Sequence, residues 1–360
     1  MVKCDRKVAL TTGENQIISH SNTFCFTVSG ESRKKNRDFR QPMTLTPATA
    51  EELAAALKQQ RAGIPLGPVD LKGLNRIRRY APEDLTIAVQ AGITLGALQA
   101  AVGRHGQWLP IDPPGADELS IAEILDRNLS GPHRHGHGTI REYLIGLRVA
   151  LADGRIIHSG GEVVKNVAGY DLLKLFVGAR RTLGIIVEAA FKLLPRPAVE
   201  TFVAVDAQSW DDVARLMEKV LGSPITPVVM DLHNVSLPAS AVARLLLGFA
   251  GTAEEVTWQL GEAQALGIHE TATLEYAAHF MRAPAGPIHH LAVLPSRVVE
   301  TLTHLEPKGS ASFVARAGQG IVAYRGTPPP AGPAELPVPT LVRRIKASFD
   351  PGQILPAFPA

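Results

Sequence analysis

The sequence predicts an α+β protein with two domains. A chain of 360 residues that is 45% hydrophobic contains enough apolar material for two separate cores. In the first half, apolar segments alternate between strand and helix patterns and then become antiparallel strands, whereas the second half passes twice through strand, helix and strand. We therefore expect mixed domains at residues 43–197 and 198–327, with the second domain arranged like a ferredoxin.

The two ends of the sequence differ from these domains. Residues 1–42 include the polar run GESRKKNRDFRQP without a hydrophobic period, so we expect an unstructured tail and consider Met43 a candidate for the original start. Residues 328–360 begin with a proline-rich stretch that favours an extended connector. The final LVRRIKASFDPGQILP then predicts one short helix and a turn that return to the fold.

Local signals define the elements of the first domain. Thr49 and Glu52 form a capping-box pattern before an alanine-rich helix. Residues 84–92 predict a strand, 94–106 a helix that ends at glycine, 144–160 a hairpin that turns at Asp153-Gly154, and 184–195 a strand that ends at proline.

Similar local signals define the strands and helices of the second domain. Strands are expected at 200–207, 227–234, 243–251, 289–295, 313–318 and 320–326, and helices at 210–221, from 254, and at 298–305.

Composition excludes several classes of function. The formal net charge is only +3, which does not indicate a nucleic-acid binder. Cys4 and Cys25 show no spacing typical of a metal site, an iron–sulfur cluster or a disulfide framework. Without a long apolar run or a signal-peptide pattern, we expect no direct membrane insertion and a cytoplasmic protein.

Two segments have the glycine and hydroxyl content that dinucleotide phosphates require, because backbone amides must approach the phosphates closely. The first is DPPGADELSIAEILDRNLSGPHRHGHGTIRE, in which Pro113-Pro114 give an extended entry and Ser120 offers a hydroxyl. The second runs from Lys165 to Glu188, where glycines interrupt an apolar stretch before the strand that follows Gly184.

Taken together with residues 82–114, these segments resemble the FAD-binding E subunits of bacterial glycolate oxidase. The resemblance covers Pro47 to Pro197 and rests on LSGPHRHGHGTIREYLIGLRVALADG and GGEVVKNVAGYDLLKLFVGARRTLGIIVEAAFKLLPRP. It implies a PCMH-type FAD-binding domain of two subdomains, of the vanillyl-alcohol oxidase superfamily, followed by a cap domain. The terminal FDPGQILP resembles that family's C-terminal return.

The same resemblance implies an FAD-dependent oxidoreductase subunit that passes hydride from a small 2-hydroxy acid such as glycolate to the flavin. Because the chain has no cysteines for clusters, it would act with a related FAD-binding catalytic subunit and an iron–sulfur subunit, and any membrane association would be peripheral, through these partners. The residues implied in FAD binding are Gly67, Pro113, Pro114, Ser120, Ile121, Ala122, Ser130, Gly131, Gly138, Lys165, Asn166, Gly169, Asp171, Gly184 and Ile186.

The sequence departs from the family pattern at four places around this cofactor. A shortened loop, residues 63–68, replaces a run of three glycines, and Ala122-Glu123 replace two glycines. Arg181 occupies a position where the family has a glycine, and Leu355-Pro356-Ala357 replace an asparagine-proline-glycine turn. Two readings remain open: an arginine compensates by binding the phosphates, or the subunit is structural and flavin-free with a degenerate FAD site.

Other polar groups have weaker functional interpretations. His133, His135 and His137 could form a metal site, but a solvated or phosphate-facing loop is the favoured reading and no metal is expected. Arg148, Arg155 and Arg180-Arg181 could bind an anion, although charges on a hairpin are usually solvated. The sequence identifies no catalytic residue.

Overall fold

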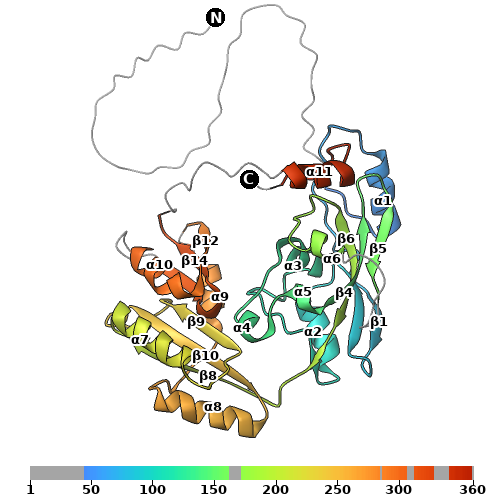
Figure 1. Cartoon of the computed structure of the whole chain (residues 1–360). Coiled ribbons are helices and arrows are strands. Elements are labelled where there is room, and N and C mark those ends of the chain that lie inside the picture. The colour runs from blue at the N-terminus through green and yellow to red at the C-terminus, as the bar shows by residue number, and fades with distance from the viewer. Residues whose placement is uncertain (1–43, 162–171, 284–285, 306–311, 328–339, 359–360) are drawn as a thin grey trace, which may run out of the picture. The chain divides into compact units, whose positions relative to one another are not determined.

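The structure is a computed structural model that describes residues 44–161, 172–283, 286–305, 312–327 and 340–358 (Figure 1). The tail predicted at 1–42, the connector at 328–339 and four candidate residues, Lys165, Asn166, Gly169 and Asp171, lie outside these ranges.

The first half of the described chain is built on a five-stranded antiparallel sheet of order β1-β2-β6-β4-β5. Its strands are β1 (Ile77–Ala81), β2 (Thr86–Gln90), β4 (Leu144–Ala150), β5 (Ile156–Gly160) and β6 (Ile185–Lys192). The predicted hairpin is confirmed as β4–β5, and Gly154 at its turn has φ +80°, which favours glycine. Two further short strands, β3 (Gln107–Trp108) and β7 (Leu194–Pro195), pair with each other in a separate antiparallel sheet.

Several helices of the first half pack against this sheet. The helices are α1 (Ala50–Gln59), α2 (Leu95–Gly103), α3 (Ile121–Arg127), α4 (Arg134–His137), α5 (Ile140–Tyr143) and α6 (Leu173–Phe176). Figure 1 shows α2, α3 and α5 together on one side of the sheet, where Leu98, Ile124 and Val187 are completely buried in one core. The predicted N-cap of α1 is confirmed, because the Thr49 hydroxyl accepts the Glu52 amide at 3.1 Å, but the Glu52 carboxylate accepts the Ala48 amide at 2.8 Å, so the capping box is incomplete.

The second half contains a seven-stranded antiparallel sheet of order β11-β8-β10-β9-β13-β14-β12. The strands are β8 (Val199–Ala207), β9 (Val229–His233), β10 (Ala243–Gly251), β11 (Glu270–Thr271), β12 (Ile288–Ala292), β13 (Ser312–Arg316) and β14 (Ile321–Arg325). The helices are α7 (Trp210–Leu221), α8 (Ala253–Ala265), α9 (Glu275–Arg282) and α10 (Val298–Leu305), with short 3₁₀ turns at Pro295–Arg297 and Ala317–Gln319.

Both faces of the seven-stranded sheet are covered. Leu245, Leu247 and Phe249 alternate along β10 into a core shared with α7, α8 and α10, whereas Leu246 points into a smaller core with Phe280 of α9. Helix α9 was not predicted from the sequence, since Leu274 at its N-cap makes no side-chain capping bond.

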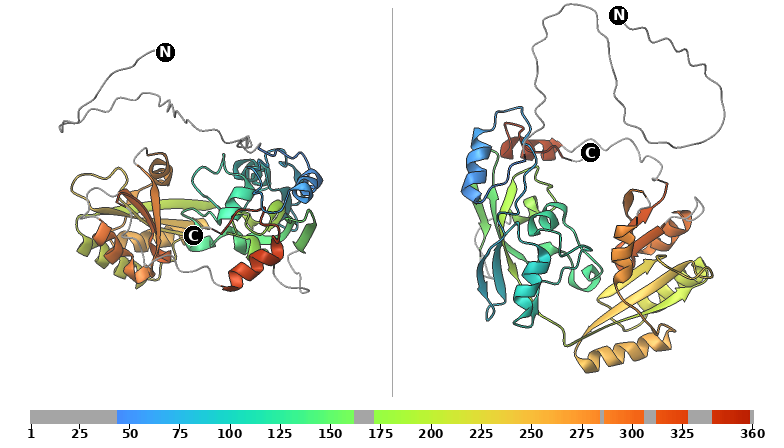
Figure 2. Two further views of the ribbon diagram at one scale, coloured as in Figure 1. Left: turned by 90° about the horizontal axis from the view of Figure 1, so that it is seen from above. Right: turned by 180° about the vertical axis from the view of Figure 1, so that it is seen from behind.

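The chain returns to its beginning at the C-terminus. Helix α11 (Thr340–Phe349) and the turn after it lie beside the loop that follows α1, as both Figure 1 and Figure 2 show. The buried carboxylate of Asp350 holds this turn by accepting the amides of Ile354 and Leu355, each at 3.0 Å, and the ammonium of Lys346 at 2.6 Å. The predicted return segment is thus confirmed as a helix and a turn.

Candidate functional site

Helix α3 begins in the first glycine- and hydroxyl-containing segment, and protein acceptors satisfy the amides of its first turn. The Ser120 hydroxyl accepts the Glu123 amide at 3.2 Å, and the Glu123 carboxylate accepts the Ser120 amide at 2.9 Å. The amides of Ile121 and Ala122 donate to backbone carbonyls of the turn after β2, at 2.9 and 2.7 Å. A pyrophosphate at a helix N-terminus needs such amides free, so this turn does not fit one.

Arg181 lies between α3 and the loop after α1. Its Nε is 2.7 Å from Oδ2 of the buried Asp126, and its Nη1 donates to the Val69 carbonyl at 2.8 Å. Burial raises the pKa of Asp126, while the charge and hydrogen bond of Arg181 act in the opposite direction. Nη2 of Arg181 has no partner within the described ranges, so this guanidinium keeps donors that could meet an anion.

The shortened loop at residues 63–68, which replaces the three glycines of the resembled family, makes contacts with the C-terminal turn. The Gly63 amide donates to the Gly352 carbonyl and the Leu66 amide to the Ile354 carbonyl, both at 2.7 Å. Gly67, a candidate cofactor-binding residue, is partly buried in this loop. The C-terminal turn therefore takes two of the amides that a phosphate-binding loop would present.

Neighbours in the chain itself explain two of the candidate glycines. A Cβ at Gly131 would lie 1.9 Å from the Asp112 carbonyl oxygen, and one at Gly184 would lie 2.6 Å from a methyl group of Val149. Gly138 has φ +77° and ends α4. Close packing requires glycine at 131 and 184, and backbone conformation favours it at 138, whether or not a ligand binds there.

The remaining described candidates for FAD binding differ in how far they are buried. Among them Pro113 and Ile186 are buried, while Pro114 and Ser130 are partly buried. The Ser130 hydroxyl accepts a bond from Arg134 at 3.1 Å. Nearby in sequence, the buried Oδ1 of Asn128 and Nε2 of His137 have no partner in the part of the chain that the structure describes, which leaves hydrogen-bonding capacity for a polar ligand.

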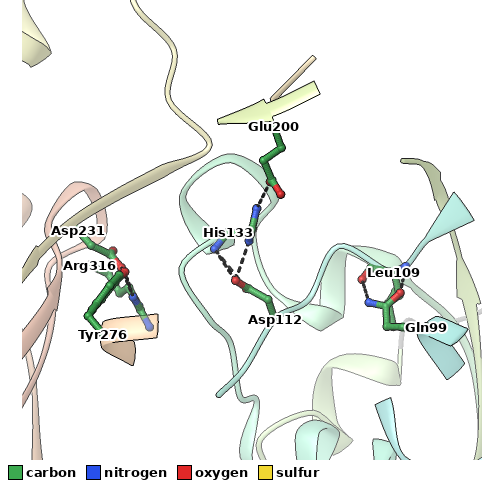
Figure 3. A network of polar contacts seen from close by, with 8 residues as sticks. All are labelled: Gln99, Leu109, Asp112, His133, Glu200, Asp231, Tyr276 and Arg316. Atoms are coloured by element: carbon green, nitrogen blue, oxygen red, sulfur yellow. Dashed lines mark hydrogen bonds and ion pairs between the residues drawn. The ribbon is translucent and has the colours of Figure 1, made fainter. Parts of the chain in front are cut away.

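His133, which precedes α4, forms the centre of a polar network that the sequence does not reveal (Figure 3). Its Nδ1 is 2.6 Å from Asp112 and its Nε2 is 2.5 Å from Glu200 of β8. Burial alone lowers the pKa of His133, but hydrogen bonds and charges from the two carboxylates outweigh it and raise the pKa to about 9. The expectation of a solvated loop is wrong for His133, which is buried and carries a positive charge at neutral pH.

Two aromatic contacts hold the same imidazole. Trp108 and Phe202 each pack edge-on against His133, with ring centroids 5.6 and 6.2 Å from the imidazole. In α4, the Gly136 amide donates to the Val228 carbonyl at 2.9 Å, before β9. Segments far apart in the sequence are therefore joined around a charged histidine, and this charge makes His133 unsuitable as a general base near neutral pH.

A second buried network lies in the seven-stranded sheet. Asp231 of β9 forms an ion pair with Arg316 of β13 and accepts a hydrogen bond from the Tyr276 hydroxyl of α9 (Figure 3). Asp231 is completely buried, and this burial raises its pKa although Arg316 and Tyr276 counteract the effect. The ring of Tyr276 stacks on His233 with centroids 4.1 Å apart.

Within the described ranges, no group of three or more His, Cys, Asp or Glu residues is arranged to hold a metal ion. None of the helices in those ranges combines the length and the apolar character that crossing a bilayer requires.

Comparison with known proteins identifies a cofactor class for this fold. Residues 67–160 match the profile of a family described as FAD binding domain. The chain is 34% identical to glycolate oxidase subunit GlcD of Bacillus subtilis over 207 residues, which cover 54% of this chain and 44% of that protein. Over 130 residues it is 38% identical to glycolate oxidase subunit GlcE of Escherichia coli, covering 36% of this chain and 37% of that protein.

A D-lactate dehydrogenase of Archaeoglobus fulgidus is 37% identical over 130 residues, or 36% of this chain and 29% of that protein. The chain thus spans less than half the length of these curated relatives. In fold, an alkyldihydroxyacetonephosphate synthase matches 87% of this chain and 75% of its own with a TM-score of 0.65, at 15% sequence identity. The chain has the predicted FAD-binding oxidase fold and is related to FAD-dependent oxidoreductases, and FAD is the cofactor that these comparisons support.

Proposed function

We propose that the protein is an FAD-binding subunit, similar to the GlcE component of glycolate oxidase, of a complex that oxidises a small 2-hydroxy acid such as glycolate. The observation that carries this proposal is the match of residues 67–160 to an FAD binding domain within a chain of the corresponding fold. The proposal includes a related catalytic subunit and an iron–sulfur subunit as partners, and a cytoplasmic location with peripheral membrane association through them. It also divides the chain into an FAD-binding domain (43–197), a cap (198–327) and a return segment (328–360).

FAD, when bound, would supply the hydride acceptor. The residues of this chain that would hold it are those around Ser130, Asn128 and His137, together with the remaining donors of Arg181. His133 would fix this region in place, since two carboxylates and Trp108 hold its imidazole. No residue is assigned as the catalytic base.

A second candidate function is a flavin-free structural subunit of the same kind of complex. The specific observation in its favour is the first turn of α3, whose amides from Ser120 to Glu123 are all satisfied by protein acceptors. Arg181 also favours a flavin-free subunit, because its guanidinium already binds Asp126 and the Val69 carbonyl. The two functions differ in one measurable property, which is FAD binding.

The deciding experiment purifies the full chain, alone and co-expressed with its partner subunits, and measures flavin absorbance at about 450 nm and thermal stabilisation by added FAD. Absorbance at that wavelength in the chain purified alone, or a melting temperature of that chain that rises with FAD concentration, supports the FAD-binding subunit. A colourless protein whose melting temperature does not respond to FAD supports the structural subunit.

A double variant in the first turn of α3 tests why FAD binding would be weak. Ala122→Gly with Glu123→Gly should raise FAD affinity about tenfold if side chains in this turn hinder the pyrophosphate, since it removes the Glu123 carboxylate. Helix α8 offers a matched control because Thr252 and Glu255 form the same capping box, so Glu254→Gly with Glu255→Gly carries a similar helix penalty far along the chain. An unchanged affinity in the α3 variant favours compensation by Arg181.

A further inference from the structure

The seven-stranded sheet holds a hollow of about 300 Å³ at one end of its strands. Arg244, at the start of β10, is one of the residues that line it. At the other end of β10, Ala250 pairs with Glu200, which binds His133 of the first half. Positions 244 and 250 are six residues apart, so about 20 Å of strand separates the hollow from that contact. None of the lining residues adjoins a gap in the described ranges.

Buried side chains form the floor of this hollow. His233 of β9, Leu246 of β10 and Tyr276 of α9 line it, and all three are buried. The rings of His233 and Tyr276 are nearly parallel, with an angle of 3° between their planes and centroids 4.1 Å apart. Such a floor can pack against the carbon skeleton of a small ligand, and the volume lies at the lower end of the range for ligand sites.

His233 provides an uncharged hydrogen-bond donor in the hollow. Its Nδ1 accepts the Val235 amide at 3.3 Å, so the proton of the neutral ring lies on Nε2. Burial, together with the positive charge of Arg244, lowers the pKa of His233 to about 4. No described residue accepts a hydrogen bond from Nε2, which leaves this donor for a ligand.

The charge of Arg244 is already balanced by carboxylates. Its Nε and Nη2 donate to the two carboxylate oxygens of Asp206 at 2.5 and 2.8 Å, and Nη2 is 3.3 Å from Glu270. Nη1 keeps its two hydrogens for another acceptor. Glu275, at the start of α9, also lines the hollow, and its carboxylate has no partner within the described ranges. With three carboxylates around one guanidinium, an anionic ligand would be repelled.

The rim of the hollow carries further polar side chains. Hydroxyl groups both donate and accept, so together with the donors of Arg244 and His233 and the acceptor Glu275 they match a ligand that does the same. Neighbouring hydroxyl groups on a carbon skeleton have this property and carry no charge. The polar residues that complete the lining are Ser236, Thr271, Thr273 and His279.

We propose that this hollow binds a small uncharged polyol, such as a monosaccharide. Arg244 and His233 donate to its oxygens, Glu275 accepts from its hydroxyl groups, and its carbon atoms pack on the floor at Tyr276. The site goes beyond the proposed function, because all of its lining residues belong to the second half and its ligand does not require FAD.

The test titrates the full chain with three sugars that share a ring and differ in charge. D-Glucose is neutral, D-glucosamine is a cation and D-glucuronate is an anion. Saturation-transfer NMR measures the dissociation constant of each. We expect saturable binding of glucose, and binding of glucuronate that is weaker by about fivefold or more because of the three carboxylates. Tighter binding of glucosamine or of glucuronate than of glucose would show that the site takes a charged ligand, and either result contradicts the proposal.

Three variants locate the binding. Glu275→Gln should weaken glucose binding about fivefold, because a neutral acceptor replaces a charged one, and the fold should tolerate this change at an exposed position. Glu254→Gln is the matched control, since this exposed glutamate lies in the first turn of α8 outside the hollow, and it should change affinity by less than about twofold. Ala272→Leu should abolish binding by filling the hollow.

The proposal is wrong if glucose does not bind. It is also wrong if Glu254→Gln weakens glucose binding as much as Glu275→Gln does, or if Ala272→Leu leaves the affinity unchanged, since the sugar would then bind elsewhere.

Discussion

Asp126–Arg181 and Asp231–Arg316 each pair a buried aspartate with a partly buried arginine, and they are built in different ways. Asp231 and Arg316 are directly paired residues of β9 and β13, so the register of the sheet brings them together. Asp126 and Arg181 come from α3 and from a turn in which Arg180 and Arg181 have φ +49° and +63°. The first pair follows from regular structure, whereas the second requires an unfavourable backbone conformation.

The difference indicates where the molecule stores strain. A left-handed conformation at a residue other than glycine costs on the order of 1 kcal/mol or more, and such residues cluster at functional sites. Arg181 lies at a position where the resembled family has glycine, and it binds the Val69 carbonyl just after the shortened loop at residues 63–68. We infer that the Arg316 pair belongs to the core of the second sheet, and that the Arg181 pair lies within the proposed cofactor region.

The largest effect is expected on breaking the Arg316 pair. Arg316→Met leaves the Asp231 carboxylate completely buried with the Tyr276 hydroxyl as its remaining partner among the described residues, which should lower the free energy of unfolding by about 3–5 kcal/mol. Urea denaturation measures this loss. Arg297→Met is the control, because its pair with Glu300 is exposed and its removal should leave the free energy of unfolding nearly unchanged. A loss for Arg316→Met no larger than that of the control would show that the Asp231–Arg316 pair contributes little.

His133 is an intermediate case, since its carboxylate partners Asp112 and Glu200 are partly exposed. The pKa of His133 in the folded protein, about 9, lies above the value of 6.5 expected after unfolding. Its contribution to stability is therefore complete below about pH 6.5 and disappears as the pH rises through 9, with a maximum of roughly 3 kcal/mol.

Denaturation of the wild type and His133→Gln between pH 6 and 10 tests this dependence. The variant should lose stability at pH 6 and approach the wild type near pH 10, whereas His158→Gln, at an exposed position, should follow the wild type throughout. If His133→Gln keeps the full pH dependence of the wild type, another group is responsible.

Local signals predicted most of the fold but little of the polar site. The helix at Trp210–Leu221 and the hairpin turn at Asp153-Gly154 are confirmed because caps, periodicity and turn residues act over a few positions. By contrast, His133 and Glu200 are 67 positions apart, and Asp126 and Arg181 are 55 apart. Such pairs depend on how the sheets and loops pack, so no spacing in the sequence indicates them.

A smaller effect is expected at Arg181. Arg181→Gly leaves Asp126 without its partner but removes the left-handed strain, so the net loss should be about 1–2 kcal/mol. The double variant Asp126→Ala with Arg181→Gly removes both charges and should recover most of this stability. Denaturation measures the free energy of unfolding of both variants, and FAD titration measures their affinity for FAD. A higher FAD affinity in the double variant identifies the pair as an obstacle to the cofactor, while a lower affinity identifies Arg181 as a phosphate ligand.

The smallest effect distinguishes a helix cap from a cofactor ligand. Ser120 and Thr252 cap α3 and α8 with the same hydrogen-bond pattern to Glu123 and Glu255, so replacement of either by alanine should cost about 1 kcal/mol in denaturation experiments. Because the two caps are alike, any difference in FAD affinity between Ser120→Ala and Thr252→Ala reports on the surroundings of α3 alone. Equal FAD affinity in the two variants would show that Ser120 acts only as a cap. A specific loss in Ser120→Ala would show that its hydroxyl contributes to the cofactor site despite the bond to Glu123.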